Sequence, residues 1–220
     1  MVYIILICIA VPMLLLMTLL DRRSRWLLGF MLVGMVVASS AYEINTTLQY
    51  LFGMSATELS VRVAPVVEEI LKAFPVLFYA VLISDNRKDV LPLAMAVGIG
   101  FAILENAFLL ITYLDQVTLA WAVVRGISTS LSHGICTLSV GCGMIFVRKQ
   151  KKLFYTGTFG LLSVAITFHA IFNLLIQSKY DWAGMLMPIA IYLAFQGGRL
   201  YRRRQREKTG ARVTPRQNKN

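Results

Sequence analysis

The chain has 220 residues, of which 57% are hydrophobic and only 15% are charged. Soluble globular proteins carry about a quarter of their residues charged, so this composition indicates a membrane protein instead. The net charge of +11 does not indicate nucleic-acid binding, because most basic residues stand just outside apolar segments, where membrane proteins keep them. The three cysteines lie within apolar segments and suggest no disulfide framework.

Seven apolar segments approach or exceed the length of about 20 residues that crosses a bilayer as a helix. They cover approximately 1–20, 26–42, 63–83, 90–112, 119–147, 153–177 and 183–200. We therefore predict an all-α polytopic membrane protein, a bundle of about seven transmembrane helices. Residues 1–200 are expected to form a single domain, without a soluble domain or an internal repeat.

The basic residues predict how the chain is oriented. Eighteen of the 22 Lys and Arg residues follow the first, third, fifth and seventh segments, whereas the opposite connections hold only Arg62 and Lys179. By the positive-inside rule, the N-terminus is outside and the C-terminus cytoplasmic, in a multi-pass protein of the cell membrane. The basic tail, 201–220, is expected to be disordered and to lie near anionic lipid headgroups.

The longest predicted outer connection, 43–62, mixes apolar and polar residues and is expected to lie along the membrane interface. Within it, Asn45-Thr46-Thr47 matches a glycosylation sequon. A sequon has meaning only in a secretory pathway, so this match carries little weight.

Ionisable residues inside the apolar segments mark the candidate site, because charges at membrane depth are costly and usually line a polar site between helices. These residues are Glu68, Glu69, Glu105, His133 and His169. At 1.5 Å per residue, four helices place them within roughly 3 Å of one plane, nearer the outer surface. Asn173 follows His169 by one turn and faces the same side. The sequence thus predicts one polar site that opens outward.

Two basic residues also fall inside the apolar segments. Lys72 is placed to offset the acids: Glu68 precedes it by four residues, the order that favours an intrahelical pair, and Glu69 precedes it by three. Arg125 is expected to reach outward or to pair with an external acid. For Lys72 with its glutamates and for Arg125, a purely structural role is the alternative, in which the ion pairs only stabilise the packing of the helices.

Paired glycines predict where the helices pack most closely. Gly98 and Gly100 lie in the fourth segment, and Gly141 and Gly143 in the fifth. Glycine lets two helix backbones approach each other, so these segments are expected to pack closely against neighbouring helices.

Glutamates and histidines in a partly dry cavity suit the activation of water. A carboxylate takes a proton from water, the water attacks a carbonyl group, and neighbouring donors stabilise the oxyanion. The same groups can instead hold a divalent metal such as zinc, and the candidate ligands are Glu68, Glu69, Glu105, His133 and His169. The zinc-protease signature His-Glu-x-x-His is absent, and the choice between a metal and no metal stays open.

The polar motifs, in this order on successive segments, resemble the PrsW family of intramembrane proteases, which belongs with the type II CAAX prenyl protease and bacteriocin-processing superfamily. The motifs are Glu68-Glu69-x-x-Lys72, Phe101-x-x-x-Glu105-Asn106, His133 and His169-x-x-x-Asn173. The resemblance covers about 65–175. Asn173 stands where PrsW proteins tend to have aspartate, and an asparagine at this position resembles the CAAX-type pattern.

The resemblance implies a peptidase with a catalytic core at 63–177 that cleaves a membrane-anchored protein, such as an anti-sigma factor, near its extracytoplasmic side. By motif position, Glu68 and Glu69 would carry the activating carboxylate, and Glu105 would be the second essential acid. His169 and Asn173 would orient the water or the oxyanion. His133 would be a further site residue, and Lys72 would support the acids.

Two other classes of function stay open on the sequence. A proton- or ion-coupled transporter can use the same carboxylates as a relay, although the chain shows no inverted repeat and no broken helix pair. A catalytically inactive scaffold can use the polar layer for packing alone. The expected partners are a membrane-anchored protein substrate and the lipid bilayer, with no nucleic acid.

Overall fold

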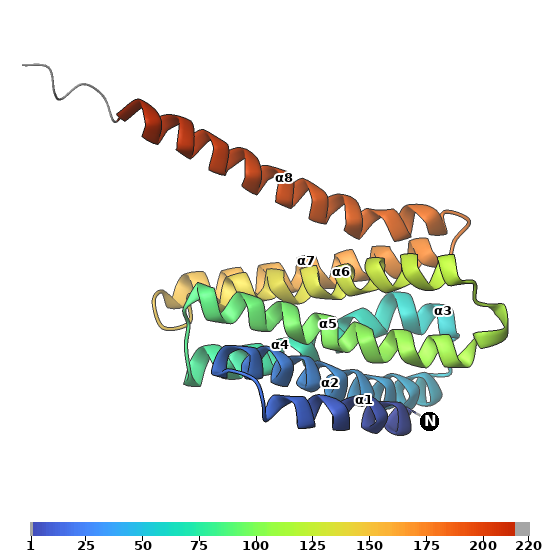
Figure 1. The fold of residues 1–220 in the computed structure, drawn as a ribbon. Helices are drawn as coiled ribbons and strands as arrows, with labels where there is room; N and C mark the ends of the chain where they lie inside the picture. The colour runs from blue at the N-terminus through green and yellow to red at the C-terminus, as the bar shows by residue number, and fades with distance from the viewer. Residues whose placement is uncertain (1, 214–220) are drawn as a thin grey trace, which may run out of the picture.

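The computed structural model of the chain describes residues 2–213, and these form helices and no strand (Figure 1). The long helices are α1 (Val2–Met17), α2 (Arg22–Phe52), α4 (Ala64–Leu82), α5 (Arg87–Thr112), α6 (Leu119–Met144), α7 (Lys151–Ile176) and α8 (Asp181–Val213). A short helix, α3 (Ala56–Glu58), and a π-helical turn, η1 (Leu59–Val63), join α2 to α4, and a 3-10 turn, η2 (Leu114–Gln116), precedes α6. The all-α prediction is confirmed.

Among the described residues, three helices are long and apolar enough to cross a membrane by length and composition, namely α2, α5 and α7. Helix α1 is apolar but has only 16 residues. Helix α4 has 19 residues, and they include Glu68, Glu69 and Lys72. The seven predicted segments each correspond to a long helix, while the number of membrane crossings and the orientation stay predictions.

Helix α5 lies in the centre of the bundle because its glycines let both neighbours approach its backbone. A Cβ atom on Gly100 would meet the backbone of Met31 in α2, and one on Gly98 would meet the backbone of His133 in α6. The contact at Gly98 therefore fixes the height of α6 at the histidine that the sequence places in the polar layer.

The other predicted glycine pair also lies at helix contacts. A Cβ atom on Gly143 would meet the backbone of Thr158 in α7, and one on Gly141 would meet the side chain of Ala94 in α5. The predicted close approach is confirmed for both pairs, and α6 is thereby held between α5 and α7.

The connections that carry basic residues gather at one end of the bundle. The turns between α1 and α2, α4 and α5, and α6 and α7 all lie at the left of Figure 1, where α8 also extends away from the other helices. This arrangement agrees with the alternation in the sequence. The side of the membrane that this end faces stays a prediction.

The prediction that 43–62 forms a connection outside the long helices is wrong. Helix α2 continues to Phe52 and ends at Gly53, whose positive φ of 61° suits glycine. Ser55 then starts α3 through a capping box, in which its hydroxyl accepts a hydrogen bond from the Glu58 N–H. Asn45 is buried and its amide donates to Glu68, so the sequon is no glycosylation site.

Helix α8 continues to Val213, through most of the tail that we expected to be disordered. The basic stretch from Arg199 to Lys208 contains no glycine or proline, and Arg, Lys, Gln and Glu are good helix formers. Residues 214–220 of that predicted tail lie outside the described residues.

We expect Gly98→Ala to destabilise the protein by about 1–3 kcal/mol, because the added Cβ atom must displace the backbone of His133. Gly126→Ala, on α6 in open space, is the matched control and should be neutral or slightly stabilising. Thermal unfolding of the detergent-solubilised protein measures both. Equal midpoints for the two variants would contradict the close contact at Gly98.

Candidate functional site

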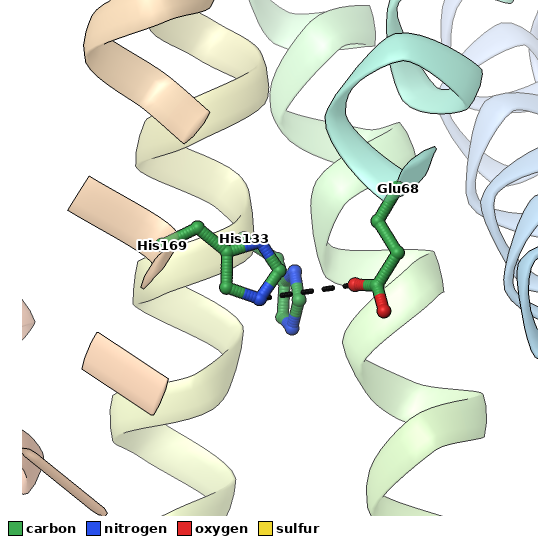
Figure 2. A group of neighbouring side chains, drawn as sticks. All are labelled: Glu68, His133 and His169. Atoms are coloured by element: carbon green, nitrogen blue, oxygen red, sulfur yellow. Dashed lines mark ion pairs between the residues drawn. The ribbon is translucent and has the colours of Figure 1, made fainter. Parts of the chain in front are cut away.

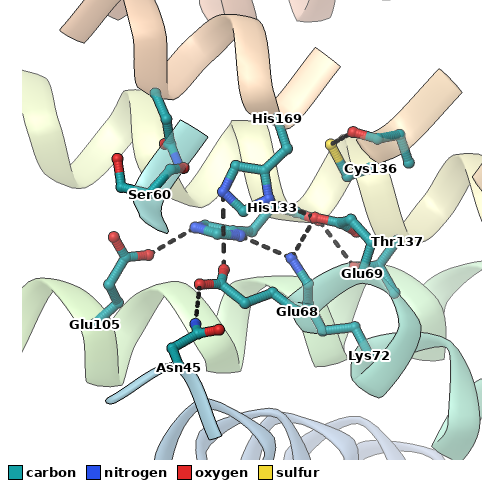
Figure 3. Close-up of polar contacts among 12 residues, drawn as sticks. Asn45, Ser60, Glu68, Glu69, Lys72, Glu105, His133, Cys136, Thr137 and His169 are labelled. Atoms are coloured by element: carbon teal, nitrogen blue, oxygen red, sulfur yellow. Dashed lines mark hydrogen bonds and ion pairs between the residues drawn. The ribbon is translucent and has the colours of Figure 1, made fainter. Parts of the chain in front are cut away.

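Four helices bring the predicted ionisable residues together in the middle of the bundle (Figure 3). Helix α4 supplies two adjacent glutamates, α5 supplies a third, and α6 and α7 supply one histidine each. The rings of His133 and His169 meet edge to face, with centroids 4.8 Å apart. Residues that are far apart in the sequence therefore form one continuous polar cluster.

A buried lysine is the central group of this cluster. Lys72 is fully buried, and its Nζ lies 2.6 Å from Glu69 Oε1 and 2.8 Å from His133 Nδ1. Because an ammonium group only donates hydrogen bonds, Nδ1 of His133 accepts and Nε2 carries the ring proton. That Nε2–H donates to Glu105 Oε2 at 2.7 Å. The lysine thus determines which nitrogen of His133 faces the acid on α5.

The expected partner of Lys72 is only partly correct. The sequence order favoured a Glu68–Lys72 pair, but the ammonium group pairs with Glu69. Successive helical residues point about 100° apart, so the two glutamates face different neighbours. The Glu68 carboxylate instead accepts a hydrogen bond from the side-chain amide of Asn45 in α2, at 3.3 Å.

His169 connects the two glutamates of α4 (Figure 3). Its Nδ1 lies 2.8 Å from Glu69 Oε1, while its Nε2 lies 3.7 Å from Glu68 Oε2. An ionised carboxylate only accepts, so Nδ1–H donates to Glu69. The Nε2 lone pair of a neutral ring then faces the Glu68 carboxylate across a gap too long for a hydrogen bond. Two electron-rich atoms in this position favour a cation between them.

Glu68, His133 and His169 each offer one ligand atom, and these atoms lie within 4.8 Å of one another (Figure 2). One carboxylate and two imidazoles form a donor set that catalytic zinc uses. Metal-binding histidines usually donate their second ring N–H to a carboxylate, as His169 does to Glu69. His133 would join by giving up its hydrogen bond to Lys72 or to Glu105. The residues therefore fit a divalent metal.

Arg125 pairs with a residue of the site. Its Nη2 lies 3.3 Å from Glu105 Oε1, and its guanidinium carbon lies 5.3 Å from the centre of the Trp121 ring. The expectation that Arg125 reaches outward or pairs with an external acid is therefore wrong. The two oxygens of Glu105 have separate partners, Arg125 on one and His133 on the other.

Asn173 lies one turn beyond His169, and its side chain is directed to η1. Its amide donates to the backbone oxygen of Ser60 at 2.8 Å. To orient a water or an oxyanion, Asn173 would have to exchange this hydrogen bond. In the structure it anchors the π-helical turn to α7.

A cavity of about 470 Å³ reaches two of the three site glutamates. It lies between α2 and α5, and α1, α4 and the α3–η1 segment also contribute residues to its lining. The side chains of Glu68 and Glu105 are 14% and 32% exposed, whereas those of Glu69 and Lys72 are fully buried. A liquid water occupies about 30 Å³, so the cavity has room for roughly fifteen waters beside these two acids.

Sequence reasoning missed Asn45 as a member of the site because it placed this residue in a connection. A signal was present in the sequence. Gly34, Ala38, Ala41 and Asn45 follow one another at helical spacing, so they share one face of a continued α2. All four are buried, and three of them are small.

The fold and this cluster define a helical membrane protein with a glutamate–histidine centre between its helices. A family model described as PrsW family intramembrane metalloprotease matches residues 22–196, and the chain belongs to that family. The protein is therefore an integral membrane peptidase. The activity of its family is proteolysis, and the family match gives no support to the transporter or scaffold alternatives. The family description also favours the divalent metal over the metal-free alternative. Comparisons with curated proteins and with solved structures give no match.

We expect Lys72→Met to destabilise the protein by about 3–5 kcal/mol, because it leaves the fully buried Glu69 without its cation. Arg62→Met is the control. It breaks the ion pair of Arg62 with Glu58, whose side chains are 77% and 50% exposed, and should cost at most about 1 kcal/mol. Unfolding midpoints in detergent compare the two variants, and a similar loss in both would contradict a structural role for the buried pair.

Proposed function

We propose that the protein is a multi-pass endopeptidase of the cell membrane that hydrolyses a peptide bond of a membrane-anchored protein near its extracytoplasmic side. One observation carries this proposal: two carboxylates, Glu68 and Glu105, are exposed to one cavity and stand next to two buried histidines. The charge distribution of the connections supports the side of the membrane. An anti-sigma factor is the substrate that the family resemblance suggests.

Glu68, His133 and His169 would hold the divalent metal. When bound, it would supply Lewis-acid polarisation of the substrate carbonyl and a lower pKa for a coordinated water. Glu69 is sealed from the cavity, so we assign it a positioning role, in place of the activating role that motif position implies for both glutamates. It holds the His169 ring through Nδ1 and balances the charge of Lys72.

Glu105 is the group that moves protons in this proposal. It lies at the cavity wall, where it takes a proton from the attacking water as the hydroxide oxygen bonds to the carbonyl carbon. It then gives this proton to the amide nitrogen as the C–N bond breaks, which releases an amine and a carboxylic acid, and the acid then loses its own proton to water to become a carboxylate. The bonds from Arg125 and His133 hold the carboxylate in place between the two transfers. Asn173 is the candidate donor to the oxyanion.

We expect Glu68→Gln and Glu105→Gln each to lower the cleavage rate by about 100-fold or more, because an amide cannot take up the proton or replace the carboxylate ligand. Glu43→Gln is the control, since Glu43 is an exposed residue of α2 whose side chain bonds only the Tyr3 hydroxyl among the described contacts. The assay uses protein in liposomes with a panel of single-span membrane proteins, and mass spectrometry of the products. Wild-type rates in both site variants would refute the assignment.

Metal content provides an independent test. The purified protein should carry about one divalent metal per chain, and 1,10-phenanthroline should stop cleavage until zinc is restored. His169→Gln should lose the metal, whereas Glu69→Gln should bind it about 10–100-fold more weakly, because Glu69 only orients the ligand. Cys142→Ser is the control and should keep the metal. Full cleavage by metal-free protein would show that no metal takes part.

A further inference from the structure

We propose that the cavity between α2 and α5 is the subsite for a large apolar side chain of the substrate, on the residue next to the bond that is cut. This inference rests on the proposed function, because it takes Glu68 and Glu105 as the groups that meet the peptide bond. It adds what the substrate must present there: an unwound segment with a bulky apolar residue.

The walls of the cavity are chemically suited to such a side chain. Ala38 and Ala41 of α2 face Phe101 and Leu104 of α5, and all four are at most 7% exposed. Polar groups lie one turn beyond Ala41 along α2, where Asn45 is bonded to Glu68. Pockets of about 300–1,000 Å³ with apolar walls and few convergent polar groups are typical of ligand sites. An apolar side chain between these walls would bring its own backbone to the acids.

Small residues of α2 line the cavity next to a close contact of α2 with α5. The two helices touch backbone to backbone at Gly34, where a Cβ atom would meet the carbonyl oxygen of Val97. One turn later the residues of α2 that line the cavity are alanines, and Phe101 and Leu104 of α5 line it with them. Small residues at 38 and 41 therefore leave the volume that a substrate side chain would fill.

Exposure along the walls gives the direction of access. Thr46 and Ala56 at one end of the cavity are exposed, Leu59 is half-buried, and Asn45 is buried beside Glu68. The opening thus lies between α2 and the α3–η1 segment, at the end of the bundle opposite the basic connections. A segment that unwinds at this opening can extend its side chain inward without moving the sealed Glu69–Lys72 pair.

One side of the opening is tied to the helix that carries His169. Ser60 in η1 accepts two hydrogen bonds from the C-terminal end of this helix, one to its backbone oxygen from Asn173 in α7 and one to its hydroxyl from the side chain of Gln177, which follows α7. The opening therefore has a defined position relative to the histidine. A peptide held in the cavity would meet the acids at a fixed point along its chain, which is what a subsite must achieve.

Two neighbouring threonines give a matched test. Thr46 and Thr47 are both exposed on α2, and each hydroxyl donates to the carbonyl oxygen four residues earlier at 2.8 Å. Of these two threonines, Thr46 lines the cavity and Thr47 is not among the residues that line it. Thr46→Phe should fill the opening, whereas Thr47→Phe adds the same side chain outside it. Leu109→Ala enlarges the same cavity from α5.

The substrates are single-span model proteins that differ only in the residue on either side of the mapped cleavage site, with Gly, Ala, Leu or Phe at that position. Wild type and Thr47→Phe should prefer Leu or Phe on one side of the bond. Thr46→Phe should lose about 10-fold or more in kcat/KM for these substrates and much less for Ala, because the pocket discriminates by volume. Leu109→Ala should improve the relative rate for Phe.

Identical selectivity in Thr46→Phe and Thr47→Phe, or an equal loss of kcat/KM for every substrate, would overturn the subsite. If Glu68→Gln still lowered the cleavage rate as expected, the proposed function would stand without the subsite. A panel that wild type does not cleave would overturn the proposed function, and the subsite with it. Bound metal and unfolding midpoints verify that each variant is folded. A shift of the preferred residue toward Ala in Thr46→Phe alone supports the subsite.

Discussion

The Lys72 ammonium group, fully buried between Glu69 and His133, is the interaction on which the rest of this structure depends. A charge inside a membrane protein is stable only with partners that compensate its desolvation. Each of the two partners of Lys72 is hydrogen-bonded to a further helix. Glu69 of α4 is bonded to His169 of α7, and His133 of α6 is bonded to Glu105 of α5. One cation thereby determines the hydrogen bonding of four helices, and it leaves Glu68 and Glu105 accessible to the cavity.

Backbone packing places these charges at the same height. Gly98 brings α5 against the backbone of His133, and Glu105 lies two turns further along α5 on the same face. Gly100 holds α5 against α2 in the same way, next to Phe101 of the cavity wall. The polar cluster and the cavity are therefore two results of one packing arrangement. A methyl group at either glycine would disturb the fold and the site together.

The helices and the convergence of four of them could be predicted, because apolar length and interrupted hydrophobicity strongly limit what a membrane segment can do. The partners could not. Whether Lys72 binds Glu68 or Glu69 depends on which neighbours each carboxylate meets across the bundle, and local spacing allows both. Asn45 was misplaced because hydropathy marks where the membrane ends, whereas α2 continues to Phe52, well beyond its apolar part. The partner of Arg125 was missed because Glu105 lies on another helix, and spacing along α6 does not reveal it.

The anchoring of η1 has a mechanical consequence. Ser60 is held by Asn173 of α7 and by Gln177, which caps the C-terminal end of that helix, so the rim of the cavity is tied to the helix that carries His169. Pressure on the rim would be felt at the ring, and displacement of the ring would reshape the rim. Binding in the cavity and the reactivity of the site around His169 would then be coupled through the last turns of α7.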